Sequence, residues 1–179
     1  MNYDLIEQGM RLILKGLEVD PSDPNFHHTP ERYRRFLSEM FESKETRWAT
    51  FEEDYTDFVL LRDHSFWSLC PHHMLPVEMM ASLAYIPNGQ VLGLSKLARV
   101  FDDLNRYPLL QEKATREAIS RVKRICKGTT GVAVLIEGRH DCMRIRGIKS
   151  HGAILSYRLD GVFDTDPVMQ QRFFSLVKE

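Results

Sequence analysis

Two short segments, far apart in the sequence, carry soft side chains at spacings that suit one metal ion. Cys70 and His73 are three residues apart, so a thiolate and an imidazole can reach the same ion from a single tight turn. Cys142 supplies a third soft ligand from the second segment. Two thiolates and one imidazole suit zinc, and three protein ligands leave one coordination position open for water, as catalytic zinc sites do. The sequence therefore predicts a catalytic zinc site held by Cys70, His73 and Cys142.

Two further histidines flank the predicted ligands and are candidates for proton transfer. His72 and His73 are adjacent, so they cannot both face one ion from an extended backbone, and the spacing from Cys70 assigns His73 to the metal. His140 precedes Cys142 by two residues. Histidine, with an unperturbed pKa of ~6.5, exchanges protons readily near neutral pH. We therefore expect His72 and His140 to act as acid–base groups, and a hydrogen bond to a metal ligand stays open as the alternative for His72.

A second group of polar side chains is typical of nucleotide binding. Lys96 and Arg99 follow Ser95 at the predicted start of a helix, and the amino terminus of a helix attracts phosphate. A charged face exposed to solvent is the alternative interpretation of these two cations. Gln111 and Glu112 place an amide and a carboxylate side by side early in the next helix. A carboxylate can accept hydrogen bonds from the ring N–H and the amino group of guanine, so this pair is a candidate for base recognition.

The composition limits the class of protein. The 179 residues fit one domain, or a compact domain with a helical arm, and a hydrophobic content of 43% is sufficient for a core. The net charge of −1 gives no general attraction to nucleic acid, and no apolar run reaches the ~18–20 residues that cross a membrane. The first residues lack the basic and apolar segments of a secretory signal. Only three cysteines argue for a reducing compartment, so we expect a cytoplasmic protein with Cys126 as a buried thiol.

Apolar residues at helical spacing predict two helices at the amino-terminal end. One covers residues 3–18, and the segment from Asp20 to Pro24 ends it. The next begins at Thr29 and Pro30, an N-cap residue followed by proline at the first helical position. These helices predict a helical arm over residues 1–45, followed by one further domain over residues 46–179.

Strand patterns dominate from Tyr55 onward. Alternate apolar positions from Val77 to Tyr85 predict a half-buried strand. A turn at residues 87–89 predicts its partner over 90–94, helices follow from Ser95 and Pro108, and further strands are expected over 132–137 and about 140–148. Hairpins with grouped helices predict an α+β fold with an antiparallel sheet.

The predicted strand from His140 would place alternate side chains on one face. His140, Cys142, Arg144 and Arg146 would share that face, and a rise of ~3.3 Å per residue would separate His140 from Cys142 by roughly 6.6 Å. One of the two could then bind the metal while the other contacts a substrate. A cysteine in the core beside a surface histidine is the alternative, and the Cys70–His73 pair argues against it.

Several of these segments, in their order along the chain, resemble one enzyme family, GTP cyclohydrolase I. The resemblance runs from about residue 5 to the end, and an element at Thr29-Pro30-Glu31-Arg32 adds to it. The motifs are Cys70-Pro71-His72-His73, Ala84-Tyr85-Ile86-Pro87-Asn88-Gly89, Gly93-Leu94-Ser95-Lys96-Leu97-Ala98-Arg99, Gln111-Glu112, and His140-Asp141-Cys142-Met143-Arg144-Ile145-Arg146-Gly147.

The resemblance implies a fold, an assembly and a reaction. The fold is the tunnelling fold, in which antiparallel sheets with helices on one side assemble around a ring. The assembly is a homodecamer of two pentamers, with active sites where subunits meet. The reaction converts GTP and water to 7,8-dihydroneopterin triphosphate and formate, the first step towards tetrahydrofolate, other pterins or deazapurines.

The resemblance also implies roles for single residues. Zinc, held by Cys70, His73 and Cys142, would lower the pKa of a water that attacks C8 of guanine. The acid–base residues would be His72, for opening of the imidazole ring, and His140, near the ribose. The substrate-binding residues would be Glu112 and Gln111 for guanine, Ser95 near the ribose, and Lys96, Arg99, Arg146, Arg32 and Arg35 for the triphosphate.

The sequence departs from the family pattern at a few positions near these motifs. Pro71 replaces a common glutamate, and Leu109 replaces a frequent glutamine. Met79 and Met80 stand where a glycine and a polar residue are frequent, and the segment over residues 152–156 is about one residue short and less polar. None of these departures removes a predicted ligand or acid–base residue.

Three alternative functions can be compared with the sequence. A zinc nucleobase deaminase requires H-x-E and P-C-x-x-C elements, and the sequence contains neither. A structural zinc module would need a fourth ligand, and no remaining histidine or cysteine forms a convincing pair. A family member with an altered reaction, such as one that stops at ring opening, remains an alternative.

Overall fold

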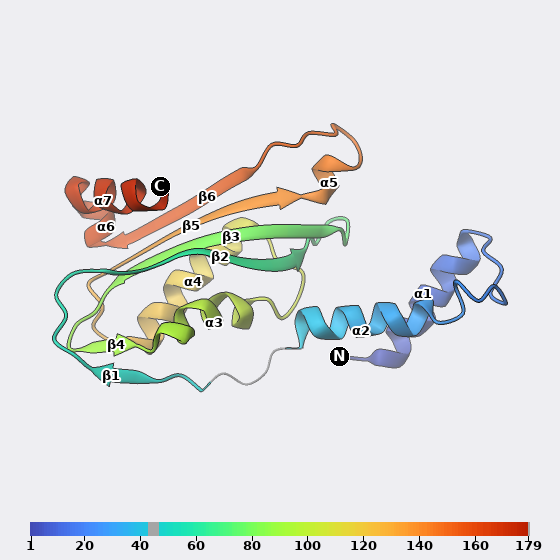
Figure 1. Cartoon of the computed structure of the whole chain (residues 1–179), viewed down its shortest axis with the longest axis horizontal. Coiled ribbons are helices and arrows are strands. Elements are labelled where there is room, and N and C mark those ends of the chain that lie inside the picture. Colours follow the sequence, from blue (N-terminus) through green and yellow to red (C-terminus); the bar gives the residue numbers. More distant parts are fainter. Residues whose placement is uncertain (43–46, 179) are drawn as a thin grey trace. The chain divides into compact units, whose positions relative to one another are not determined.

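The computed structural model describes residues 1–42 and 47–178. The chain divides into two compact units, Met1–Ser43 and Lys44–Glu179. The residues of each unit contact mainly one another, and Figure 1 shows the elements of both units. No helix in the described part of the chain is long and apolar enough to cross a membrane.

The first unit is a pair of helices. Helix α1 covers Tyr3–Gly16 and begins at Asn2, whose side chain accepts a hydrogen bond from the Leu5 amide. Helix α2 covers Thr29–Phe41 and has a proline in its first turn, but its N-cap residue is His28 and not the predicted Thr29. The helices pack against each other, and Arg34 of α2 pairs with Glu7 of α1 at 2.8 Å. Both predicted helices are therefore confirmed.

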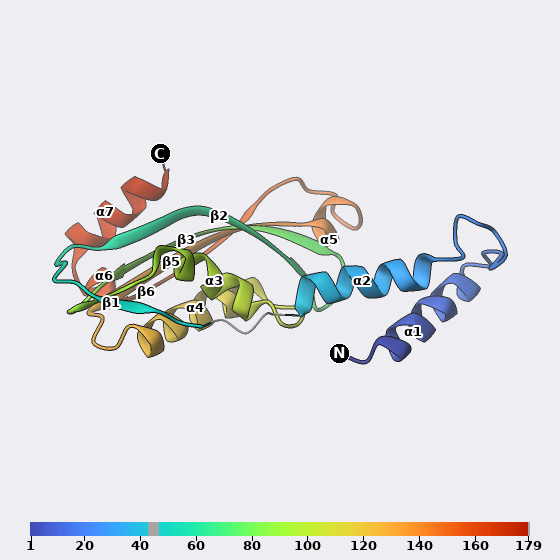
Figure 2. The ribbon, with the colours of Figure 1, turned by 60° about the horizontal axis from the view of Figure 1, so that its bottom comes forward.

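The second unit contains a four-stranded antiparallel sheet in the order β2-β3-β5-β6. A small sheet pairs β1 with β4. Figures 1 and 2 show helices α3 and α4 on one face of the large sheet and α6 and α7 towards the other. The strands are β1 (Thr50–Glu52), β2 (Val59–Leu69), β3 (Pro76–Ile86), β4 (Gln90–Leu92), β5 (Gly131–His140) and β6 (Ile154–Gly161). The helices are α3 (Leu94–Leu104), α4 (Gln111–Ile125), α5 (Asp141–Arg144), α6 (Val162–Thr165) and α7 (Pro167–Lys178). The α+β class with an antiparallel sheet is confirmed.

The alternation along β3 separates two apolar clusters. Side chains of one parity, from Val77 to Tyr85, are buried with those of α3 and α4 in the larger cluster. Side chains of the other parity, such as Ala84, pack with Phe163 and Phe173 on the opposite face. The predicted inward parity of this strand is confirmed, and Cys126 is fully buried as expected.

The predicted partner of β3 is wrong. Residues 90–94 do not return along β3, because Gln90–Leu92 is a short strand that pairs with β1. β3 pairs instead with β2 and β5. The pattern of β2 was hard to detect because the register shifts between Leu61 and His64, where Asp63 has a φ of 55°. Such a bulge shifts the alternation by one residue.

The predicted strand over residues 140–148 is also wrong. β5 continues through Gly138 and Arg139 to His140, and the chain then turns into the short helix α5. The common face proposed for His140, Cys142, Arg144 and Arg146 therefore does not exist. β5 pairs with β6 at its other edge, and neither β6 nor α7, which follow residue 148, is among the predicted elements.

The starts of two helices also differ from the sequence predictions. Helix α3 begins at Leu94 with Gly93 as its N-cap residue, two positions before Ser95, the predicted N-cap. Helix α4 begins at Gln111 instead of Pro108, since the backbone of Leu110 is still extended. Gln111 is consequently the first helical residue, and its side chain points into the protein, where it is 3% exposed.

Candidate metal centre

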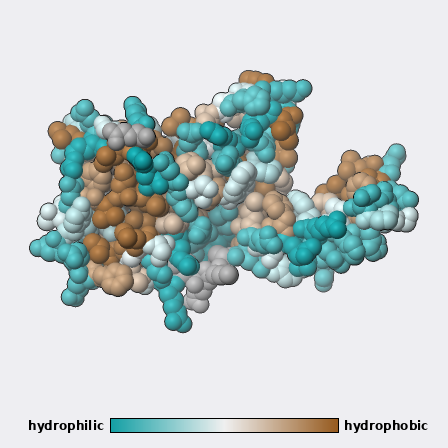
Figure 3. All heavy atoms as spheres, in the orientation of Figure 1, coloured by the Kyte–Doolittle hydropathy of each residue, from teal (hydrophilic) through white to brown (hydrophobic). Residues whose placement is uncertain are grey.

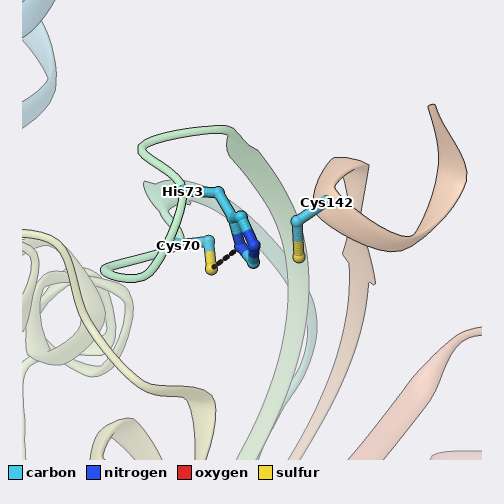
Figure 4. A group of neighbouring side chains, drawn as sticks. All are labelled: Cys70, His73 and Cys142. Atoms are coloured by element: carbon cyan, nitrogen blue, oxygen red, sulfur yellow. Dashed lines mark hydrogen bonds between the residues drawn. The ribbon is translucent and has the colours of Figure 1, made fainter. Parts of the chain in front are cut away.

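Cys70, His73 and Cys142 lie together at one end of the large sheet. One ligand atom from each residue lies within 4.8 Å of the others. Cys70 and His73 come from the turn between β2 and β3, and Cys142 comes from α5, as Figure 4 shows. Two segments separated by about seventy residues of sequence therefore meet at the group that the spacing predicts.

Backbone hydrogen bonds fix the turn that carries the first two side chains. The Cys70 amide donates to the Leu75 carbonyl at 2.8 Å, and the Cys70 carbonyl accepts from Met74 at 2.8 Å and from His73 at 3.3 Å. Met74 has a φ of 54°, which reverses the chain. This closed turn brings the Cys70 sulfur to 3.7 Å from Nδ1 of His73.

His72 lies on the exposed side of the same turn. Its Nδ1 is 3.9 Å from the Cys70 sulfur, but the residue does not belong to the group in which all ligand atoms lie close together. The two adjacent rings are 6.3 Å apart, with an angle of 73° between their planes. His72 is therefore beside the sulfur without converging on Cys142.

Two neighbouring side chains, Cys70 and Arg146, act on the Cys142 thiol. Burial raises the pKa of the Cys142 thiol, and the neighbouring Cys70 adds to this effect, whereas the Arg146 guanidinium lowers it. Arg146 also donates a hydrogen bond from Nη1 to Nε2 of His73 at 2.7 Å. The Arg146 guanidinium therefore offsets part of the effect of burial on the Cys142 thiol.

His140 ends β5 next to this group and is bound to Gln111. Nε2 of His140 lies 3.0 Å from Oε1 of Gln111. Burial lowers the pKa of His140, and the Glu112 carboxylate acts in the opposite direction. Glu112 itself is exposed at the start of α4, so its carboxylate is free of the core.

The comparison with known proteins gives the family of the chain. The profile of the family "GTP cyclohydrolase I" matches residues 6–178. The chain belongs to the GTP cyclohydrolase I family. It is 38% identical over 183 residues to "GTP cyclohydrolase 1" of Rhodopirellula baltica, covering 99% of this chain and 80% of that protein. It is 37% identical over 185 residues to "GTP cyclohydrolase 1" of a Geobacillus species, covering 99% of this chain and 98% of that protein.

Membership of this family makes the protein an enzyme, because these relatives are enzymes. Among solved structures, an archaeosine synthase QueF-Like in the apo form covers 58% of this chain and 95% of its own, with 19% identity and a TM-score of 0.46. That likeness is too slight to support an argument. The family rests on the sequence match, and the site rests on the residues above.

A metal ion would find a suitable group of donors at this end of the sheet. Cys70, His73 and Cys142 supply two sulfurs and an imidazole nitrogen, all able to reach one ion after a small closure. This set is too soft for magnesium or calcium and suits zinc. No fourth histidine, cysteine or carboxylate joins the group among the residues that the structure describes, which is the arrangement of an open site.

The candidate phosphate-binding residues lie elsewhere on the second unit. The strand β3 leads from the Cys70 turn to the turn before β4, over roughly 33 Å at ~3.3 Å per residue. Helix α3 begins directly after β4, so Ser95 and Lys96 lie near the far end of the strand from the metal group. Arg99 lies farther along α3 and is exposed. One chain therefore does not bring Ser95 and Lys96 to Cys70.

The remaining candidate substrate-binding residues belong partly to the first unit and partly to the second. Arg146 lies at the metal group, as described. Arg32 and Arg35 are both exposed on α2 of the first unit. Gln111 is close to His140, but its side chain is enclosed and its amide nitrogen is bound to two backbone carbonyls. Sequence reasoning did not detect the Gln111–His140 or Arg146–His73 contacts, because they join residues whose separation in the chain gives no periodic signal.

The departures from the family pattern have structural explanations at three positions. Leu109 is 2% exposed and Met79 is 1% exposed, and both belong to the larger apolar cluster. An apolar side chain is favoured at each of these buried positions. Pro71 is exposed in the turn that follows Cys70, where its fixed φ suits a tight turn. The structure gives no reason for the shortened segment over residues 152–156.

Proposed function

We propose that this protein is a zinc-dependent GTP cyclohydrolase I that converts GTP and water to 7,8-dihydroneopterin triphosphate and formate. The observation that carries the proposal is the convergence of Cys70, His73 and Cys142 in a chain of this family. We further propose that residues 46–179 form a catalytic domain of the tunnelling-fold type and that residues 1–45 form its helical arm. The product would enter tetrahydrofolate, other pterin or deazapurine synthesis.

The proposed metal site has one chemical task. Cys70, His73 and Cys142 would hold zinc, which when bound supplies the Lewis acidity that makes water a nucleophile near neutral pH. The chain contributes by holding the three donors on a closed turn and a short helix. Arg146 donates a hydrogen bond to Nε2 of His73 in this structure, and that bond would give way when the imidazole binds zinc.

Two histidines would move the protons. His72 is exposed beside the Cys70 sulfur, so it can reach a substrate at the metal group without giving up a ligand position. We assign it to opening of the guanine imidazole ring. His140 is partly buried beside the metal group and would be a second proton donor. We assign it to proton transfer near the ribose.

Recognition of GTP would need residues from both ends of the β3 strand: those near the metal group and those at the start of α3. Glu112 is exposed next to His140 and can accept the two N–H groups on the edge of guanine. Lys96, Arg99 and Arg146 would hold the triphosphate, with Arg32 and Arg35 of the first unit, and Ser95 would lie near the ribose. Cations at such positions form charge-assisted hydrogen bonds to phosphate.

The separation of these groups supports an active site shared between copies. Ser95 and Lys96 lie about a strand's length from Cys70, too far for one GTP molecule within a single chain. Figure 3 shows apolar side chains gathered on the second unit. Phe51 and Leu94 line the same hollow beside β4, and they are 59% and 77% exposed. A surface of this kind marks a contact with another protein. We propose that another copy covers it and brings its own metal group to Lys96, within a homodecamer.

Mixing two inactive variants tests this shared site. Cys142→Ser removes a metal ligand, and the double variant Lys96→Ala/Arg99→Ala removes the phosphate-binding cations. Co-expressed in equal amounts, the two should recover about a quarter of normal activity, because that fraction of sites draws each half from an intact copy.

The matched control is co-expression of Cys70→Ser with Cys142→Ser. Both changes affect the same half of the site, so no combination of copies restores it, and activity should stay absent. Recovery in the first mixture and none in the control supports the shared site. Failure of the first mixture to recover, with mixed oligomers demonstrated by mass spectrometry, would place each site within one chain.

A further inference from the structure

A buried glutamine holds the ring of His140. Gln111 begins α4, and its side chain lies against the ends of β5 and β6. Its amide nitrogen lies 3.0 Å from the Ile136 carbonyl oxygen and 2.8 Å from the Ile154 carbonyl oxygen. Its amide oxygen lies 3.0 Å from Nε2 of His140. All the polar atoms of this side chain therefore have partners inside the protein.

The two carbonyls determine which way the amide faces. Both are acceptors, so the group between them must be the NH₂, which has two hydrogens to donate. The opposite orientation would place the amide oxygen against two carbonyl oxygens, with no hydrogen between these acceptors. The amide oxygen of Gln111 is consequently fixed towards His140.

This orientation determines the tautomer of the histidine. An amide oxygen only accepts, so Nε2 of His140 must carry the hydrogen that it receives. In the neutral ring, Nδ1 is then the nitrogen with a free lone pair. The hydrogen bond to one ring nitrogen thus decides the chemistry available at the other.

The backbone leaves room for this pair at Gly138. A Cβ added at Gly138 would lie 2.0 Å from Oε1 of Gln111 and 3.1 Å from Nε2 of His140. Any larger residue would therefore displace the glutamine oxygen from the histidine. The glycine sits inside β5, paired with Met79 and Ile154, so it is not required by a turn.

We propose that Gln111 is a positioning residue that holds His140 as the Nε2–H tautomer, so that His140 exchanges protons with the substrate through Nδ1. The inference rests on the proposed function for the role of His140, and it adds the ring atom that acts and the residue that selects it. Gln111 contributes to proton transfer and not to the edge of guanine, since its amide has no unused donor or acceptor directed away from these partners.

The tautomer can be measured without any variant. Solid-state NMR of the whole protein with ¹⁵N-labelled histidine, at a pH where the ring is neutral, distinguishes a protonated ring nitrogen from a bare one. The His140 signals are assigned by their loss in His140→Asn. We expect a hydrogen on Nε2 and none on Nδ1. A hydrogen on Nδ1 would overturn the proposal.

The variant Gln111→Met then tests the consequence, since it keeps the length of the side chain and removes its polar atoms. We expect the kcat with GTP to fall at least ~10-fold, with KM changed by less than about 3-fold, and a mixture of His140 tautomers. Gln171→Met, a change at an exposed glutamine of α7, should alter none of these.

Two kinetic outcomes would overturn the proposal: a raised KM with normal kcat, which would mean guanine recognition, or unchanged kcat and tautomer. The NMR result on the unmodified protein stands even if Gln111→Met does not fold. Normal activity of His140→Asn would instead remove the catalytic role of His140, which belongs to the proposed function, and the measured tautomer would be unaffected.

Discussion

Replacement of Cys70 or Cys142 by serine is expected to abolish both zinc binding and turnover of GTP. Each sulfur is one of three donors that converge on the same point, and a serine hydroxyl is a far weaker ligand for zinc than a thiolate. Because two donors cannot hold a catalytic zinc ion against dialysis, the variants should contain less than about a tenth of the zinc of the unmodified protein. Metal content is measured by mass spectrometry after dialysis, and activity is measured as formate release.

The third cysteine provides a matched control. Cys126 is buried at the end of α4, where its sulfur donates to the Gln90 carbonyl at 3.1 Å, and a serine hydroxyl can make the same bond. Cys126→Ser should therefore keep its zinc and its activity. Retention of zinc and turnover in either Cys70→Ser or Cys142→Ser, with a circular dichroism spectrum like that of the control, would refute the ligand assignment.

Replacement of His72 by alanine should separate metal binding from proton transfer. His72 lies 3.9 Å from the Cys70 sulfur but outside the converging group, so the variant should bind zinc normally. Loss of a general acid–base group lowers the rate ~10²–10⁴-fold, and we expect a decrease of this size in kcat. Zinc content and steady-state kinetics are measured on the same preparation.

An exposed histidine of the first unit gives the comparison for this variant. His27→Ala removes a similar side chain and should leave both quantities unchanged. Near-normal turnover of His72→Ala would reduce His72 to a hydrogen-bond partner of the site. Loss of zinc from His72→Ala would mean that this histidine, and not only His73, is a ligand.

The sequence predicts local features of this fold well and pairings between distant segments poorly. The inward parity of β3 follows from Val77 to Tyr85 alone, because a period of two is a local property. The partner of that strand does not, since the turn at residues 87–89 leads to β4, which pairs with β1. One of its two true neighbours, β2, contains a bulge at Asp63 that interrupts its alternation.

The candidate site also contains features that local sequence patterns predict and features that depend on distant parts of the chain. The spacing of Cys70 and His73 requires only a tight turn, so the sequence is sufficient to predict their proximity. Cys142 lies close to Cys70 and His73 as expected, but a short helix, α5, holds it there and not the predicted strand. The role inferred for Gln111 depends on carbonyls of β5 and β6, which no local pattern could reveal.

The most direct test of the proposed function is product analysis. The protein loaded with zinc and the same protein stripped by a chelator are incubated with GTP, and the products are identified by mass spectrometry. Formate and 7,8-dihydroneopterin triphosphate from the zinc-loaded protein alone are the predicted result. A formamidopyrimidine as the sole product would mean that the site opens the guanine ring and stops there. Unchanged GTP with the zinc-loaded protein would contradict the proposed function.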